Sequence, residues 1–185
     1  LQRDSSGQLI ADLKQGDLQA RQIAAIIQTV RPDVILLNEF DFDAANQAAD
    51  LFRQNYLGVN QAETRAIRYP HTFAGPVNTG VPTGLDLNGN QRIDDPADAF
   101  GFGKHPGQYG MLVLSRLPID TPRVRTFQKF LWHEMPNALL PTHPRSQQSF
   151  YSNEALQIFR LSSKSHWDLP LRIGNRSLHF LVCHP

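Results

Sequence analysis

Apolar residues recur at helical spacing directly after Asp17. They are Leu18, Ile23, Ile26, Ile27 and Val30. Asp is a favoured first residue because its carboxylate accepts hydrogen bonds from the free N–H groups of the first helical turn. Pro32 follows at a place where a helix cannot continue. The pattern therefore predicts a helix that is capped by Asp17 and ends before Pro32.

Short continuous apolar runs predict strands elsewhere in the chain. Val34–Leu37 follows the helix directly, and Met111–Leu114 lies much further along. Runs of this kind are typical of strands that are covered on both faces. Three more strand-like segments lie near the C-terminus, at about 157–161, 169–173 and 178–183. Gly174–Arg176 predicts a turn between the last two.

The middle of the chain has less regular patterning. A helix is predicted from about Ala44 to Phe52, and residues from about 60 to 108 are then rich in Gly, Pro, Asn and Asp. A loop of this length inside a compact domain is usually functional or stabilised by a ligand, because its backbone has few regular partners. A second irregular region covers about 136–149.

Composition and charge exclude some classes of protein. The 185 residues include 18 Lys and Arg against 17 Asp and Glu, and 41% are hydrophobic. This balance lacks the basic excess of a typical DNA-binding protein, although a local phosphate site needs only a few donors or a metal. No apolar run approaches the roughly 20 residues of a membrane helix. One globular domain over residues 1–185, or part of one, is expected.

Both ends of the chain lack the usual boundaries. It starts without Met and without a signal-peptide pattern, and it ends at Pro185 just after a predicted strand. We therefore expect more protein to follow. The single cysteine, Cys183, cannot form an internal disulfide and leaves the redox compartment open.

Asn38 and Glu39 stand at the C-terminal end of the first apolar strand. Proteins with α/β and sandwich folds often place ligand-binding groups at such strand ends. A carboxylate with an amide neighbour suits a hard cation such as Mg²⁺, which takes one or two carboxylates and keeps several waters. A solvated surface Glu would give the same pattern, so this feature alone leaves both interpretations open.

Two later segments follow Asn38–Glu39 in a characteristic order. Gly110–Pro118 contains a glycine, an apolar strand and then Leu-Ser-Arg with a nearby proline, and Leu178–His184 is a strand that leads to a histidine. Together they resemble the endonuclease/exonuclease/phosphatase superfamily, which has the deoxyribonuclease-I-like fold. The resemblance covers nearly the whole chain. It implies an α+β sandwich of two mixed β-sheets flanked by helices, of which this chain would be an N-terminal portion, incomplete at both ends.

The resemblance also implies roles for individual residues. Glu39, with Asn38, would hold Mg²⁺ or Mn²⁺, and His184 would contact the phosphate oxygens. Asp168 would fix the tautomer of His184 from a neighbouring strand, and Tyr109 would lie near the scissile phosphate. Counting back from Ser115, either Gln108 or Tyr109 could occupy this position. Each of these two roles has an alternative. Tyr109 could be an ordinary half-buried aromatic residue, and Asp168 could be an edge carboxylate without a partner.

Three features of the family are absent from these 185 residues. They are an Asn on the first strand, a catalytic Asp-x-Asn and a C-terminal Ser-Asp-His region. The remaining catalytic residues are therefore expected outside this sequence.

The irregular middle region holds a candidate calcium loop. Asp86, Asn88, Asn90 and Asp94 occupy relative positions 1, 3, 5 and 9 of an EF-hand-like pattern. Gln91 stands where that pattern has glycine, and Ala97 where it has the last acidic ligand, with Asp98 one residue later. A metal-free turn rich in Asn, Asp and Gly is the alternative. Bound Ca²⁺ would order a loop beside the cleft and take no part in the chemistry.

The sequence thus predicts a metal-dependent phosphoesterase that hydrolyses phosphodiester bonds, as nucleases do, by attack of an activated water. A phosphatase acting on a small phosphorylated molecule is one alternative, and the near-neutral charge favours it over a polyanion substrate. A non-catalytic, calcium-stabilised binding module is another. The calcium-like loop and the resemblance to secreted bacterial members favour a secreted or periplasmic protein. A monomer is expected.

Overall fold

The computed structural model describes residues 1–184. Its helices are α1 (Gln8–Gln15), α2 (Leu18–Val30), α3 (Gln47–Leu51) and α4 (Asn153–Ile158), with a π-helical segment at Phe52–Leu57. Its strands are β1 (Val34–Asn38), β2 (His71–Ala74), β3 (Met111–Ser115), β4 (Arg125–Thr126), β5 (His166–Ile173) and β6 (Arg176–Cys183). Single turns of 3₁₀ helix lie at Pro96–Asp98, Thr121–Arg123 and Trp132–Glu134.

The strands form two three-stranded sheets, in the orders β1-β3-β2 and β4-β5-β6. Every neighbouring pair of strands in them is antiparallel. The expectation of mixed sheets is therefore wrong for the described residues. The coarser prediction of an α+β fold is confirmed, because helices and antiparallel sheets occur together.

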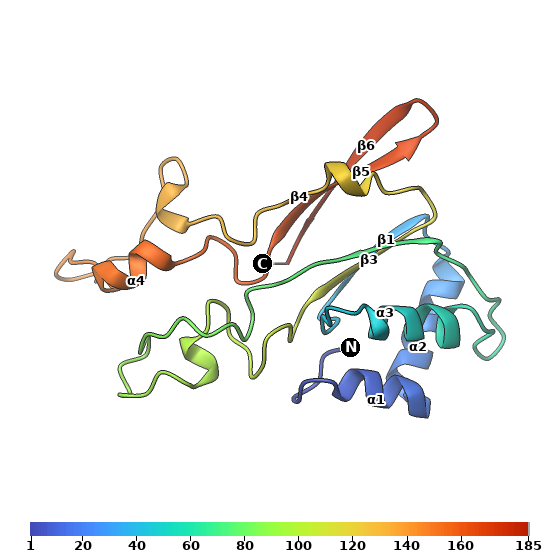
Figure 1. Cartoon of the computed structure of the whole chain (residues 1–185), viewed down its shortest axis with the longest axis horizontal. Coiled ribbons are helices and arrows are strands. Elements are labelled where there is room, and N and C mark those ends of the chain that lie inside the picture. The colour runs from blue at the N-terminus through green and yellow to red at the C-terminus, as the bar shows by residue number, and fades with distance from the viewer. Residues whose placement is uncertain (185) are drawn as a thin grey trace.

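The first sheet lies between helices and the second sheet. In Figure 1, α1, α2 and α3 lie on one side of β1 and β3, and the hairpin β5–β6 lies on the other. Side chains alternate between the faces of a strand. Leu112 and Leu114 of β3 accordingly pack with the helices, whereas Met111 and Val113 pack with Trp167 and other residues of the second sheet. One face of each sheet thus contributes to a shared apolar cluster.

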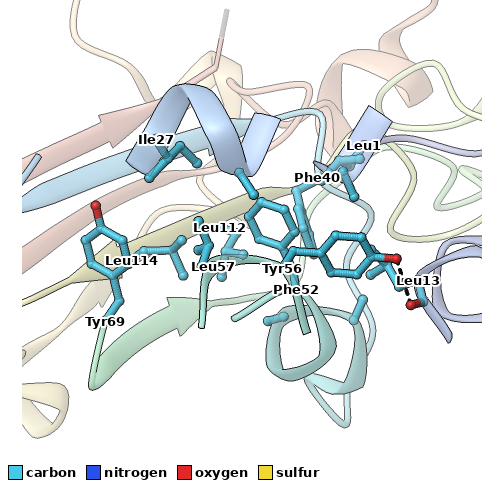
Figure 2. Packing of buried hydrophobic residues seen from close by; sticks show 14 of the residues in the cluster. Leu1, Leu13, Ile27, Phe40, Phe52, Tyr56, Leu57, Tyr69, Leu112 and Leu114 are labelled. Atoms are coloured by element: carbon cyan, nitrogen blue, oxygen red, sulfur yellow. Dashed lines mark hydrogen bonds between the residues drawn. The ribbon is translucent and has the colours of Figure 1, made fainter. Parts of the chain in front are cut away.

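Tyr56 joins the helices of the first cluster. Its ring is buried beside Phe52, and its hydroxyl donates a hydrogen bond of 2.8 Å to the carbonyl of Leu13 (Figure 2). The same oxygen accepts a hydrogen bond of 2.8 Å from the N–H of Asp17. A buried Tyr needs such partners, because an unpaired hydroxyl is costly in an apolar environment.

Several predicted elements are confirmed. Helix α2 starts after Asp17, whose carboxylate accepts a hydrogen bond of 2.6 Å from the N–H of Ala20, and it ends before Pro32. Strands β1 and β3 and the hairpin β5–β6 also lie where the apolar runs predict them. The apolar face of α2 is only partly covered, because Ile27 is buried while Ile26 is 63% exposed.

Other predicted elements differ from the structure. Residues near 157–161 were expected to form a strand, but Asn153–Ile158 forms α4 because the Ser152 hydroxyl caps it by accepting a hydrogen bond from Ala155 N–H. The helix expected from Ala44 starts only at Gln47 and continues as the π-helical segment. The irregular region contains β2, which pairs with β3. Within residues 1–184, no helix has the length and apolar character needed to cross a membrane.

Candidate functional site

Glu39 is the first residue after β1 and lies in the left-handed backbone region, with a φ of 57°. Its side chain is half exposed, at 53%. The next residue, Phe40, is buried, and its N–H donates a hydrogen bond of 3.1 Å to the carbonyl of Gly110. The pairing of β1 with β3 and the buried Phe40 thus fix the backbone on both sides of the carboxylate.

The segment before β3 packs tightly on the residues that follow Glu39. A Cβ atom added to Gly110 would lie 2.6 Å from the carbonyl oxygen of Phe40, which is closer than atoms can approach. The N–H of Tyr109 donates a hydrogen bond of 3.0 Å to Asp41, and the N–H of Phe42 donates one of 2.9 Å to Gly107. Glycine at position 110 therefore permits the close backbone contact that positions Glu39.

His184 follows β6 and approaches Glu39 from the second sheet. Its Nε2 atom lies 3.6 Å from Oε1 of Glu39. The imidazole is 17% exposed, and both of its ring nitrogens are enclosed without a hydrogen-bond partner among the described residues. Buried polar atoms are normally paired, so the two ring nitrogens are unsatisfied hydrogen-bonding groups beside the Glu39 carboxylate.

Lys164 belongs to the same region and was missed by the sequence analysis. Burial lowers the pKa of its ammonium group, while the nearby carboxylate of Glu39 raises that pKa. Its backbone is held by a hydrogen bond of 2.9 Å from Asn78 N–H to its carbonyl oxygen. No sequence pattern singled out this lysine, because its position depends on contacts between segments far apart in the chain.

Tyr109 and Gln108, the two alternatives for one predicted role, differ in the structure. Gln108 is fully buried. Its side-chain N–H₂ donates a hydrogen bond of 2.8 Å to the carbonyl of Arg3, and its side-chain oxygen accepts one of 2.7 Å from the N–H of Lys104. The side chain of Gln108 therefore links the backbone of Arg3 to that of Lys104. Tyr109 is half-buried with a φ of 54° and lies two residues before β3, where its N–H contacts Asp41.

Asp168 does not lie beside His184, which corrects the predicted pairing. Its carboxylate instead accepts a hydrogen bond of 2.7 Å from Nδ1 of His179 and one of 2.6 Å from Arg125. The strand register places Asp168 opposite Leu181, three residues before His184. At about 3.3 Å per residue of strand, His184 is too far along the chain for contact with Asp168.

The two partners of Asp168 keep it ionised. Hydrogen bonds from Arg125 and then from His179 lower the pKa of this carboxyl group. The side chain of Asp168 is 3% exposed, while those of Arg125 and His179 are 68% and 52% exposed. No sequence pattern predicts a role for His179, because its contact with Asp168 depends on the register of β5 and β6.

The residues around Glu39 fit a divalent cation that keeps much of its water. No group of three or more His, Cys, Asp or Glu side chains within residues 1–184 is close enough to hold a metal. Mg²⁺, however, commonly takes only one or two protein carboxylates and retains several waters. Glu39 and the adjacent Asn38 offer oxygen ligands of the right kind.

A cavity of about 440 Å³ lies next to this region. Asp41 and Phe42, just after Glu39, line one part of it, and Val77, His105 and Gln128 line others. Burial raises the pKa of Asp41, which is held by the N–H groups of Arg3 and Tyr109. Glu39 and His184 themselves do not line this cavity.

The predicted calcium residues lie apart from Glu39 in the loop between β2 and β3. Asp86 accepts hydrogen bonds from three successive N–H groups, those of Gly89, Asn90 and Gln91. Asn88 and Asn90 both donate from their side chains to Asp95. Asp94 forms an exposed ion pair of 3.2 Å with Arg92.

A carboxylate that follows one sheet thus faces an enclosed imidazole that follows the other. Residues 6–176 match the sequence model of the Endonuclease/Exonuclease/phosphatase family, so the chain belongs to this family. Its members are generally metal-dependent hydrolases of phosphate esters, and the resemblance inferred from the sequence is confirmed. No curated protein and no solved structure matches the chain significantly.

Proposed function

We propose that the protein hydrolyses phosphodiester bonds with the help of Mg²⁺ or Mn²⁺ at the site of Glu39 and His184. One observation carries this proposal: the two side chains are 3.6 Å apart at their closest atoms, and the enclosed imidazole nitrogens have no hydrogen-bond partner within residues 1–184. Membership in a family of phosphate-ester hydrolases supports it.

Each residue of the site has a separate task in this proposal. Glu39, with Asn38, would hold the cation, and the cation would supply positive charge to the phosphoryl oxygens and activate the attacking water. His184 would donate a hydrogen bond from a ring nitrogen to a phosphoryl oxygen. Lys164 would add a positive charge to the same oxygens, and Tyr109 would border the scissile group. A hydrogen bond from a charged donor strengthens as negative charge develops in the transition state.

A phosphomonoester of a small molecule is the second candidate substrate. The net charge of +1 provides no basic excess for a long polyanion. The cavity beside Asp41 also has apolar side chains in its lining, among them Phe42 and Val77. A compact phosphorylated molecule with an apolar part would use both the cavity and the charged site.

The test compares bis-(p-nitrophenyl) phosphate with p-nitrophenyl phosphate as substrates of the intact gene product. Each is assayed with EDTA and then with Mg²⁺, Mn²⁺ or Ca²⁺ restored. Metal-dependent turnover of the diester is the expected result, and preference for the monoester would assign the protein to the phosphatases. A lack of turnover of either ester, with nucleic acid also left intact, would contradict both and favour a non-catalytic binding module.

We also propose that the protein acts outside the cytoplasm, as a monomer. The calcium-like sequence pattern that begins at Asp86 and the resemblance to secreted bacterial members of the family support an external location. Cell fractionation and sedimentation of the native protein test the two parts separately. Recovery from the cytoplasmic fraction would contradict the first, and a stable dimer the second.

A further inference from the structure

Three arginines of the described chain are half-buried, and one of them has no counter-charge. They are Arg3, Arg53 and Arg160. Arg3 forms ion pairs with two aspartates and Arg53 with one, whereas Arg160 forms none within residues 1–184. A guanidinium group stays protonated, and a charge that is partly removed from water normally has a partner of opposite sign. Arg160 therefore lacks the anion that the other two arginines have.

Two neighbours hold the guanidinium group of Arg160 in place. Its Cζ atom lies over the ring of Phe100, 3.9 Å from the ring centre. Its Nη1 atom donates a hydrogen bond to Oδ1 of Asn78. The N–H groups on Nε and Nη2 have no acceptor in the described part of the chain. The group is thus fixed at one end and on one face, and its other N–H groups are free to bind an anion.

Asn78 connects Arg160 with Lys164. It is fully buried, and its side-chain N–H₂ donates hydrogen bonds of 2.8 Å to the carbonyl of Gln128 and 2.7 Å to that of Ser162. These two contacts direct the side-chain oxygen of Asn78 toward Arg160. The backbone N–H of Asn78 donates a hydrogen bond of 2.9 Å to the carbonyl of Lys164. One buried side chain therefore holds both cations in place.

Lys164 extends this arrangement to the proposed hydrolytic site. It is the only half-buried lysine within residues 1–184, and it forms no ion pair there. Its ammonium group interacts with the charge of Glu39. His166, two residues later, pairs with Cys183, the neighbour of His184. Two half-buried cations without ion pairs thus follow one another from Asn78 toward the site.

We propose that Arg160 binds a second phosphate group of the substrate, next to the phosphate that is hydrolysed at Glu39 and His184. The identity of the first phosphate rests on the proposed function. A second phosphate would supply the missing negative charge, and two of its oxygens can accept parallel N–H groups from one guanidinium. The preferred substrate therefore carries at least two phosphate groups, and a simple phosphomonoester would leave Arg160 unused.

The test measures the binding of thymidine 3′,5′-bisphosphate and of thymidine 5′-monophosphate to the protein by isothermal titration calorimetry in EDTA. We expect the bisphosphate to bind at least about tenfold more tightly, because hydrogen bonds between charged groups are strong. Arg160→Gln should reduce this preference to within about twofold, since glutamine carries no charge. Arg145→Gln is the matched control at an exposed position, and it should keep the preference of the parent.

Circular dichroism shows whether Arg160→Gln folds. If it does not, Arg160→Lys decides, because lysine keeps the charge but lacks the paired N–H groups, and its preference should be smaller than that of the parent. Equal binding of the two nucleotides by the parent would overturn the proposal. A full preference in Arg160→Gln would overturn the role of Arg160. Binding of inorganic phosphate that depends on Arg160, without a preference between the nucleotides, would assign the position to a free anion and also overturn the proposal.

Turnover of the 5′-p-nitrophenyl esters of the same two nucleotides, with Mg²⁺ restored, separates this inference from the proposed function. We expect the ester with the additional phosphate to have the higher kcat/KM in the parent and in Arg145→Gln. A binding preference for the bisphosphate without hydrolysis of either ester would contradict the proposed function alone. Hydrolysis of both esters with the same kcat/KM would contradict the second phosphate group alone.

Discussion

The Nε2 atom of His184 lies 3.6 Å from Oε1 of Glu39, although the two residues follow strands of different sheets. Glu39 is fixed by β1 and the buried Phe40, and His184 by its connection to β6. The apolar cluster that contains Val113 and Trp167 joins the two sheets. Packing between the sheets therefore sets the distance across the site.

Glu39→Gln is expected to lower metal-dependent turnover by about 100-fold or more, because the change removes a ligand charge from the metal. The side chain is 53% exposed, so the melting temperature should change little. Glu63→Gln is the matched control, since Glu63 is exposed elsewhere on the surface. Steady-state kinetics of the two variants provide the comparison, and full activity of Glu39→Gln would remove Glu39 from the site.

Lys164→Gln is expected to lower kcat by about 10-fold or more, since hydrogen bonds to charged groups are worth about 1.5–3 kcal/mol. Lys129→Gln, at an exposed position, should leave kcat unchanged. A kcat close to that of the parent in Lys164→Arg would show that turnover depends on the positive charge at this position. If Lys164→Gln changes only the melting temperature, Lys164 supports the fold and does not contact phosphate.

Gly110→Ala is expected to reduce activity by displacing Glu39. The added methyl group would clash with the Phe40 carbonyl at 2.6 Å, so the ends of β1 and β3 must separate. Gly174→Ala is the control, because an added Cβ atom there meets open space. The φ of 57° at Gly174 makes alanine unfavourable by only about 1–2 kcal/mol. Equal kcat values for both variants and the parent would contradict the role of this contact.

Leu112→Ala is expected to lower the free energy of unfolding by about 2–5 kcal/mol, because it leaves a cavity in the core. Leu112 is fully buried in the central strand β3. Leu139→Ala should change the free energy of unfolding by less than about 0.5 kcal/mol, since Leu139 is 88% exposed. Urea denaturation followed by circular dichroism measures both, and similar effects would show that β3 is not in the core.

Asp168→Asn is expected to reduce the loss of stability in acid. Arg125 and His179 lower the folded-state pKa of Asp168 below its ordinary value of 3.8, so the ionised carboxylate stabilises the fold above that value. This stabilisation is lost as the pH falls from 3.8 toward the folded-state pKa. Melting temperatures measured across this range should fall more steeply for the parent than for Asp168→Asn. If the melting temperatures of the parent and Asp168→Asn fall in parallel, the contacts of Asp168 with Arg125 and His179 do not stabilise the fold.

Local sequence patterns were sufficient for much of the fold and for the family. Asp17 caps α2 through its own side chain, and the apolar runs of β1 and β3 form strands because their neighbours on both faces are apolar. The segment near 157–161 shows the limit of this approach. Its apolar residues suit a strand, but the Ser152 cap and the surrounding contacts favour the helix α4.

The sequence by itself determined the helix after Asp17, the strands β1 and β3, the hairpin near the C-terminus and the order of motifs that identifies the family. Only the tertiary structure decided which side chains meet. It paired Asp168 with His179, placed Lys164 near Glu39, and enclosed Asp98 while leaving Asp94 exposed. The physical reason is that helix caps and apolar periodicity act between near neighbours, whereas these contacts depend on strand register and on the packing of distant segments.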